Sequence, residues 1–178
     1  NKYGIPIPER QKTAQEIARE QKAKQVIATN ELAAKFYQAC LTKTPYGKAA
    51  LDYLHNRGIT DDIIEDFSMG FAINSFNGLM NALGKRGYNG EMLMQAGLAV
   101  PGKNGGAYDK FRGRVMIPIK DPRGRIVGFT GRILGDGMPK YMNTGETEFF
   151  IKRYLLFGLD IAVNEIRKTR QAIVVEGH

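Results

Sequence analysis

Hydrophobic and polar positions divide the chain into a helical first part and a strand-rich second part. Up to Gly97, apolar residues recur every three or four positions, as they do on the buried face of a helix. From Leu98 onward they alternate with polar residues and glycine, as in a strand with one buried face. The pattern predicts an α+β fold in three segments: helices over 1–97, a small, mainly antiparallel sheet over 98–158, and a helix with a further strand over 159–178.

Two helices are predicted in the first forty or so residues. Residues 9–28 are charged and polar, which predicts an extended lead followed by an exposed helix. Asn30 is of a residue type that caps helix N-termini, and Leu32, Phe36 and Cys40 follow it at four-residue spacing. We therefore expect a second, better-packed helix to begin at Asn30.

Short helical segments are predicted to follow. Thr44-Pro45 begins the first, because Thr accepts hydrogen bonds from first-turn amides and Pro fits the first helical position, and Gly58 ends it. Thr60 begins the next, with acids where the helix dipole favours them. Its apolar residues, expected to point inward, are Ile63, Ile64 and Phe67. Two further turns are predicted around 79–83 and 92–94.

A β-hairpin is predicted over residues 112–132. Its first strand alternates two sets of side chains: Val115, Ile117 and Ile119 on one side, and Arg112, Arg114, Met116 and Lys120 on the other. Asp121-Pro122-Arg123-Gly124 has the residue order of a type I turn. The apolar residues of the return strand are Ile126, Val127 and Phe129, and it ends at Gly131 and Arg132.

The last twenty residues predict a helix over 160–170 and then the start of a buried strand in "AIVVEGH". Ile161, Val163 and Ile166 are expected to face partly inward. A domain rarely ends on its most apolar strand without a partner element. We therefore expect this sequence to be a piece of a longer protein.

Composition excludes several classes of protein. Hydrophobic residues make up 43% of the chain, enough for a packed core. No apolar run of about 18 residues is present, and the N-terminal residues lack the apolar stretch of a secretory signal, so no membrane association is expected. Cys40 is the single cysteine, which leaves no internal disulfide and is typical of the reducing cytoplasm.

The positive charge of the chain is concentrated in its second part. The net charge is +8, and residues 101–158 hold eleven Lys and Arg against five Asp and Glu, while the remainder is nearly balanced. A localised excess indicates a polyanionic partner. Charges placed on a hairpin are ordered before binding, whereas a flexible tail loses about 1–2 kcal/mol of backbone entropy per residue. Tyr141 adds an aromatic plane on which a base or sugar can stack, although taken alone it is more typical of a half-buried aromatic residue in a sheet.

Ordered sequence segments resemble the RNA polymerase core of bacterial DnaG-type DNA primases. They include "ALDYLHNRGIT", "IEDFSMGFA", "YDKFRGRVMIPIKDPRGRIVGFTGRIL", "PKYMNTGET", "LFGLDIA" and "VVEG", and the likeness runs from about Tyr3 to the end. Such primases synthesise short RNA primers on single-stranded DNA. The resemblance implies that this chain is the N-terminal basic subdomain, cut at the start of the metal-binding Toprim subdomain.

The resemblance also implies roles for individual residues. The positions that correspond to a basic groove between the two subdomains are Arg57, Lys110, Arg112, Arg114 and Arg132. The "PKYMN" motif makes Lys140, Tyr141 and Asn143 candidates to hold the template or the incoming nucleotide, and Lys152 corresponds to a lysine linked to nucleotide phosphates. Two departures stand out: Thr130 replaces a glycine, and "FIKR" replaces the usual Phe-His-Lys-Gly around Lys152.

Glu176 of "VVEG" corresponds to a metal-linked catalytic acid, if it is native, and the same Glu-Gly-His could equally be the stub of an expression tag. In the parent enzyme it would join further acids to hold Mg²⁺, or Mn²⁺, for nucleotidyl transfer; without them, this piece alone is expected to be inactive. Zinc is expected only in a separate domain. The implied partners are single-stranded DNA, nucleoside triphosphates, the RNA primer–DNA hybrid and, through a further domain, the replicative helicase. The implied location is the bacterial cytoplasm, at replication forks.

Two readings outside the primase family remain open from the residues themselves. The first is a non-catalytic module that binds single-stranded nucleic acid. The second is a scaffold protein that binds polyanions or associates with ribosomes. The sequence beyond Gly177 would discriminate, because an Asp-x-Asp within a following βα pattern favours the primase.

Overall fold

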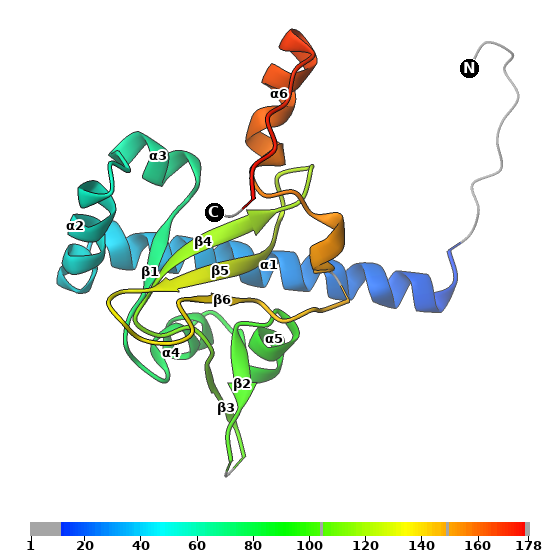
Figure 1. The fold of residues 1–178 in the computed structure, drawn as a ribbon. Helices are drawn as coiled ribbons and strands as arrows, with labels where there is room; N and C mark the ends of the chain where they lie inside the picture. The colour runs from blue at the N-terminus through cyan, green and yellow to red at the C-terminus, as the bar shows by residue number, and fades with distance from the viewer. Residues whose placement is uncertain (1–11, 104, 149, 177–178) are drawn as a thin grey trace, which may run out of the picture.

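A long helix, α1 (Ala14–Thr42), runs along one face of a four-stranded antiparallel sheet in the computed structural model of the protein (Figure 1). The structure describes residues 12–103, 105–148 and 150–176. Short helices cluster at two edges of the sheet, a two-stranded hairpin projects from one side, and a last helix projects from another (Figure 1). The predicted α+β class is confirmed.

The helix α1 is continuous, so the prediction that a separate helix begins at Asn30 is wrong. It begins with a capping box: the Thr13 hydroxyl accepts from the Glu16 amide at 3.2 Å, and a Glu16 carboxylate oxygen accepts from the Thr13 amide at 2.8 Å. Asn30 is fully buried inside the helix, and its Nδ2 donates to the Ile126 carbonyl at 3.2 Å. Asn30, whose residue type is common at helix N-termini, thus makes a tertiary hydrogen bond from the middle of a helix. Neither α1 nor any other helix within the described ranges is long and apolar enough to cross a membrane.

The sheet has the order β1–β4–β5–β6, with every neighbouring pair antiparallel. Its strands are β1 (Gly70–Ala72), β4 (Arg114–Lys120), β5 (Ile126–Ile133) and β6 (Tyr141–Asn143). The predicted hairpin is confirmed as β4 and β5. In its turn the Gly124 amide donates to the Asp121 carbonyl at 2.8 Å, and the Asp121 carboxylate accepts from the amides of Arg123 and Arg125. The separate projecting hairpin is β2 (Ala99–Pro101) with β3 (Ala107–Asp109).

The helical segments before residue 97 occur close to their predicted positions. They are η1 (Pro45–Gly47), α2 (Lys48–Asn56), α3 (Asp61–Asp66), α4 (Gly78–Gly84) and α5 (Gly90–Gln95). Two details differ from the prediction. The Thr44 hydroxyl does not cap a helix but donates to the Cys40 carbonyl at 2.7 Å, at the end of α1. Ile63 is exposed, while Ile64, one residue on, fills the core.

Two clusters of buried side chains hold these layers together, one on each face of the sheet. Between α1 and the sheet, Tyr37 meets Phe129 edge-on at a centroid distance of 5.6 Å, and Met116 packs beside them. On the opposite face, Val115 packs with residues of α2 and α3, including Leu54. Both faces of β4 are therefore partly covered, which a one-sided alternation does not predict.

The C-terminal part departs most from the prediction. Beyond η2 (Lys152–Tyr154), the helix α6 (Leu159–Thr169) forms as predicted, but Ile161 is exposed. Residues 171–176 form no strand, and Val174 is 78% exposed. The prediction of a buried strand is therefore wrong for this structure, because residues 171–176 pair with none of the described strands, and an apolar strand is stable only when it is paired.

Asp109 connects the projecting hairpin to α4. Its carboxylate accepts from the amides of Leu79 and Met80 at 2.7 and 3.1 Å, at the start of that helix. Burial raises the pKa of Asp109 above its ordinary value, against the lowering effect of these amides and of Arg112. The folded protein therefore takes up a proton here more readily than the unfolded chain does.

We expect Asp109→Asn to change the pH dependence of stability. A carboxyl with a raised folded-state pKa contributes stability fully below its unfolded pKa, about 3.9, and loses that contribution as the pH rises through the folded value. The free energy of unfolding of the wild type relative to the variant should thus fall from about pH 4 to pH 7, measured by urea unfolding. A relative stability that rises over this range would contradict the assignment.

Candidate nucleic-acid interface

The sheet face that α1 does not cover, termed here the open face, carries the polar side chains of interest. Register places Val115, Arg132 and Tyr141 in one row across β4, β5 and β6. The next row on the same face is Ile117, Thr130 and Asn143. Residues that lie far apart in the sequence thereby come to lie side by side.

A cleft of about 340 Å³ lies between this face and the helices α2 and α3; we term it the arginine cleft. Its polar lining residues are Tyr53, Arg57, Arg132 and Tyr141. Its apolar lining residues are Leu54, Ile59, Ile63, Phe67, Met69, Val115, Ile117 and Phe157. Two guanidinium groups thus border a space with an apolar floor, which suits a ligand that has both phosphates and rings.

Tyrosine side chains hold both arginines of the cleft. The Arg132 guanidinium donates to the hydroxyls of Tyr53 and Tyr141 and lies 5.5 and 5.0 Å from the centres of their rings. Arg57, which ends α2, lies 5.1 Å from the centre of the Tyr53 ring. Desolvation lowers the pKa of Arg132, but the hydrogen bonds to Tyr141 and Tyr53 outweigh it and raise the pKa above its ordinary value. Arg132 is therefore held in place before any ligand binds, and Arg57 lies against the Tyr53 ring.

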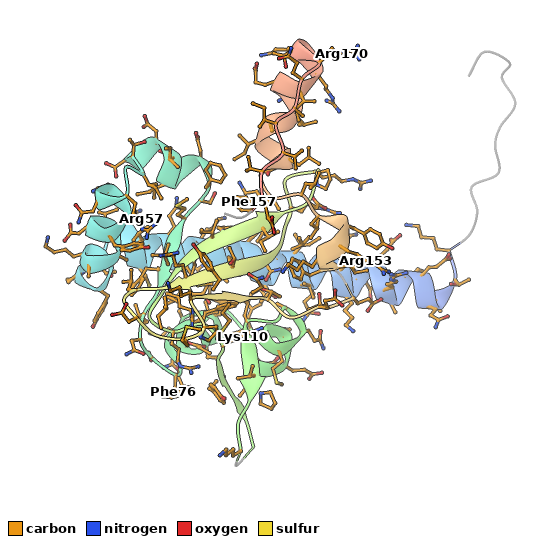
Figure 2. All side chains as sticks on the ribbon, in the orientation of Figure 1. Arg57, Phe76, Lys110, Arg153, Phe157 and Arg170 are labelled. Carbon is orange, nitrogen blue, oxygen red and sulfur yellow. The ribbon has the colours of Figure 1, made fainter. Side chains whose placement is uncertain are left out.

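A smaller cavity of about 170 Å³ adjoins the cleft on the open face. Thr130, Asn143 and Lys152 are its polar lining residues, and the rings of Phe150 and Phe157 line it as well. Phe157 borders both spaces and stacks on Phe67 at a centroid distance of 5.8 Å. Figure 2 shows Phe157 at the sheet, near the place where the chain leads into α6.

An aromatic surface that sequence reasoning missed lies at the base of the β2–β3 hairpin; we term it the Phe76 platform. The Arg112 guanidinium lies 4.5 Å from the centre of the Phe76 ring and 5.4 Å from that of Tyr108. The Phe76 side chain is 61% exposed, and it meets Tyr108 at 5.7 Å. Because Phe76 comes from a segment far from Tyr108 and Arg112 in the sequence, no local spacing indicates this group.

Arg114 is enclosed by the fold and lines neither the cleft nor the smaller cavity. Its side chain is buried, and Nη1 donates to the carbonyls of Gly131 and Pro139 at 3.1 and 3.0 Å. Burial, followed by the charge of Arg112, lowers its pKa from the ordinary arginine value. The predicted shared side of Arg112 and Arg114 is wrong because Gly113, with φ of +60°, interrupts the extended backbone between them.

The lysines predicted for the groove lie in different surroundings. Lys110 is half-buried, its ammonium lies 5.6 Å from the centre of the Phe111 ring, and burial lowers its pKa. Lys140 is exposed beside Tyr141, and Lys152 is exposed at the smaller cavity. Of the predicted residues, the structure therefore brings together Arg57, Arg132 and Tyr141 in the cleft, and Asn143 and Lys152 in the cavity.

The predicted metal acid lines neither the cleft nor the smaller cavity. Glu176 is exposed at the end of the described chain, and Gly177 and His178 lie outside the described residues. Within the described ranges, no three His, Cys, Asp or Glu side chains come together as metal ligands would. Mg²⁺ in phosphoryl-transfer sites is held by one or two carboxylates together with waters and substrate phosphates. The described residues alone thus do not make up the magnesium site that the resemblance implies.

Comparison with known proteins gives a consistent family. Residues 36–163 match the model of the DNA primase catalytic core, N-terminal domain. A DNA primase of Staphylococcus aureus (strain MSSA476) is 44% identical over 154 residues, which are 86% of this chain and 26% of that protein. The chain thus spans about a quarter of the length of this curated relative.

Solved structures agree in fold. The RNA polymerase domain of Mycobacterium tuberculosis primase DnaG, in complex with a double-stranded DNA oligomer with a 6-nucleotide overhang, superposes with a TM-score of 0.81 at 36% identity, over 87% of this chain and 49% of that one. A DnaG primase catalytic domain bound to single-stranded DNA has a TM-score of 0.74 at 38% identity, over 82% and 47% of the two chains.

Replacing Arg114 should affect folding, whereas replacing Arg132 should not. Arg114→Met leaves buried carbonyls without a donor, and we expect a loss of about 1–3 kcal/mol in the free energy of unfolding. Arg132→Met removes a partly exposed cation and should change it by less than about 1 kcal/mol. Urea unfolding of both variants checks the difference. Equal losses would show that Arg114 has no special structural role.

Proposed function

The chain belongs to the DNA primase catalytic core family as its N-terminal domain, and from this premise we propose that it holds template DNA and nucleoside triphosphates for RNA primer synthesis. The parent protein is then a nucleotidyltransferase, a DNA-directed RNA polymerase. The observation that carries this proposal is the arginine cleft, in which Arg57 and Arg132 are fixed by two tyrosines above an apolar floor.

Template binding is assigned to the cleft and to the Phe76 platform. Single-stranded DNA is bound by cations that neutralise its phosphates and by aromatic rings on which its bases stack. Arg57, Arg132 and Arg112 provide the cations, and the Phe76 ring offers an exposed face beside Arg112. Relatives crystallised with single-stranded DNA and with an overhanging duplex support DNA binding by this domain.

Nucleotide binding is assigned to the smaller cavity and its rim. Lys152 and Lys140 are exposed cations on the two sides of Asn143 in the sequence, and Arg132 lies in the neighbouring row of the open face. Cations placed there would neutralise a triphosphate and the charge that develops on it during transfer. Lys110 is half-buried and its pKa is lowered by burial, and we expect it to contribute to nucleotide binding only from a greater distance.

Metal chemistry is assigned to the parent enzyme and not to this chain by itself. A Toprim subdomain with further acids would complete a Mg²⁺ or Mn²⁺ site around Glu176, if Glu176 is native, and the metal would there stabilise the transferring phosphate. We expect this piece alone to be inactive. Contacts with an RNA–DNA hybrid and with the replicative helicase are likewise proposals for the whole protein.

Binding of single-stranded DNA should weaken with salt, and each lost phosphate contact should reduce that dependence. Removing one contact lowers the slope of log K against log salt by about 0.7 on single strands. We expect this reduction for Arg57→Ala and for Arg112→Ala, measured by fluorescence anisotropy of a labelled oligonucleotide at several salt concentrations.

Arg170→Ala is the matched control for these variants. Arg170 is an exposed arginine at the far end of α6, and Figure 2 shows it well away from Arg57 and Phe76. It should leave both affinity and slope unchanged. If Arg170→Ala weakened binding as much as the other two variants, binding would depend on net charge alone and not on the cleft and platform.

The Phe76 platform predicts a stacking contribution that does not depend on salt. Phe76→Ala should weaken binding by the loss of one stacked base, about 1–3 kcal/mol, while leaving the salt slope as it is. Phe76→Tyr retains the ring and should bind like the wild type. An unchanged affinity for Phe76→Ala would remove the platform from the template path.

A further inference from the structure

Two buried oxygen atoms on the open face have no hydrogen-bond partner within the described part of the chain. They are Oγ1 of Thr130 and Oδ1 of Asn143. Thr130 is fully buried, and the two residues are directly opposed on β5 and β6. Buried polar atoms are nearly always hydrogen-bonded, so an unpaired couple on one face requires an explanation.

Both residues line the cavity of about 170 Å³, and the surroundings of this cavity limit what it can take. Its walls are largely apolar, with rings from Phe150 and Phe157. Lys152 adds a cation on the wall, and Arg132 lies two residues along β5 on the same face. A fitting ligand therefore combines an anionic group with hydrogen-bond donors that reach two neighbouring oxygens.

We propose that Thr130 and Asn143 form a ribose subsite that distinguishes ribonucleotides from deoxyribonucleotides. Ribose carries two vicinal hydroxyl groups, each of which donates a hydrogen bond, and its phosphates are the anions that Lys152 and Arg132 complement. A deoxyribose leaves one of the two buried oxygens unpaired and binds more weakly for that reason. This inference rests on the proposed binding of nucleoside triphosphates to the same cavity.

Access to the subsite depends on Phe157. Because Thr130 is fully buried, a ligand reaches its hydroxyl only when a cavity wall moves aside. Phe157 is 40% exposed and borders both the cavity and the arginine cleft. As the residue that separates the two spaces, Phe157 is the wall that we propose moves when a ligand enters from the cleft.

The test compares ATP with its 2′-deoxy and 3′-deoxy analogues by equilibrium dialysis against this chain. We expect the wild type to bind ATP about tenfold more tightly than the analogue that lacks the recognised hydroxyl, as one hydrogen bond to a buried partner allows. Thr130→Val keeps the shape of the side chain and removes the hydroxyl. It should weaken ATP to the level of that analogue and leave the analogue itself unchanged.

Thr29→Val is the matched control, since Thr29 is also fully buried but lies on α1 and donates to the Gln25 carbonyl. It should preserve the preference for ATP, and circular dichroism of both variants checks that they fold. Inorganic triphosphate, which has no sugar, serves as the second probe and should bind the wild type and Thr130→Val alike.

The outcomes separate this inference from the proposed function. If triphosphate and ATP bind but Thr130→Val shifts ATP and both analogues equally, or shifts none, the ribose subsite is overturned while nucleotide binding stands. If the wild type binds neither ATP nor triphosphate, the proposed nucleotide site fails and the subsite fails with it. A preference for ATP that only Thr130→Val abolishes supports the subsite.

Discussion

The register between β4 and β5 is the constraint on which the site depends. Pairing Val115 with Arg132 and Met116 with Gly131 sends Arg132 to the open face and Met116 to the core under α1. A shift of this strand pairing by one residue would move the side chains of each face to the opposite face of the sheet. Gly131 suits this register, because a Cβ there would lie about 3.0 Å from Phe111 and 3.1 Å from Arg114 and Met116, closer than most Cβ contacts.

Burial sorts chemically identical arginines into different roles. Arg114 is enclosed and donates its hydrogen bonds to backbone carbonyls, so it links β5 to the segment that leads into β6. Arg132 lies on the opposite face, where tyrosines orient it and leave it at the edge of a cleft. Arg112 lies outside the strand and packs against two exposed or half-buried rings. Only the last two positions leave the charge near solvent, where a phosphate can reach it.

Aromatic side chains make these cations useful to a flexible partner. A polynucleotide loses conformational freedom when it binds, and a surface that must also be ordered would add to that loss. The rings of Tyr53, Tyr141 and Phe76 have their centres within about 5.5 Å of the guanidinium groups that they contact. These arginine side chains are therefore oriented before a polynucleotide binds. The apolar residues beneath them lower the local polarity and strengthen the attraction for phosphate.

The sequence by itself determined the order of elements, the α+β class and the hairpin with its turn. Those features follow from local periodicity and from residues such as Asp121 and Gly124, whose preferences act within a few positions. Through its ordered motifs it also led to the family. Five residues named from that resemblance line the two spaces beside the open face: Arg57, Arg132, Tyr141, Asn143 and Lys152.

Which charged side chains are exposed to a ligand depends on tertiary packing, and the sequence did not predict it. Asn30 has the residue type of a helix cap but is buried in the middle of α1, and Arg114 alternates like a surface residue but is enclosed by backbone carbonyls. The strand expected after residue 171 does not form, because this segment pairs with none of the described strands. Phe76 joins Arg112, and Thr130 faces Asn143, only because separate segments pack together. Local sequence encodes backbone preference, whereas burial and partnership arise from contacts between residues far apart in the chain.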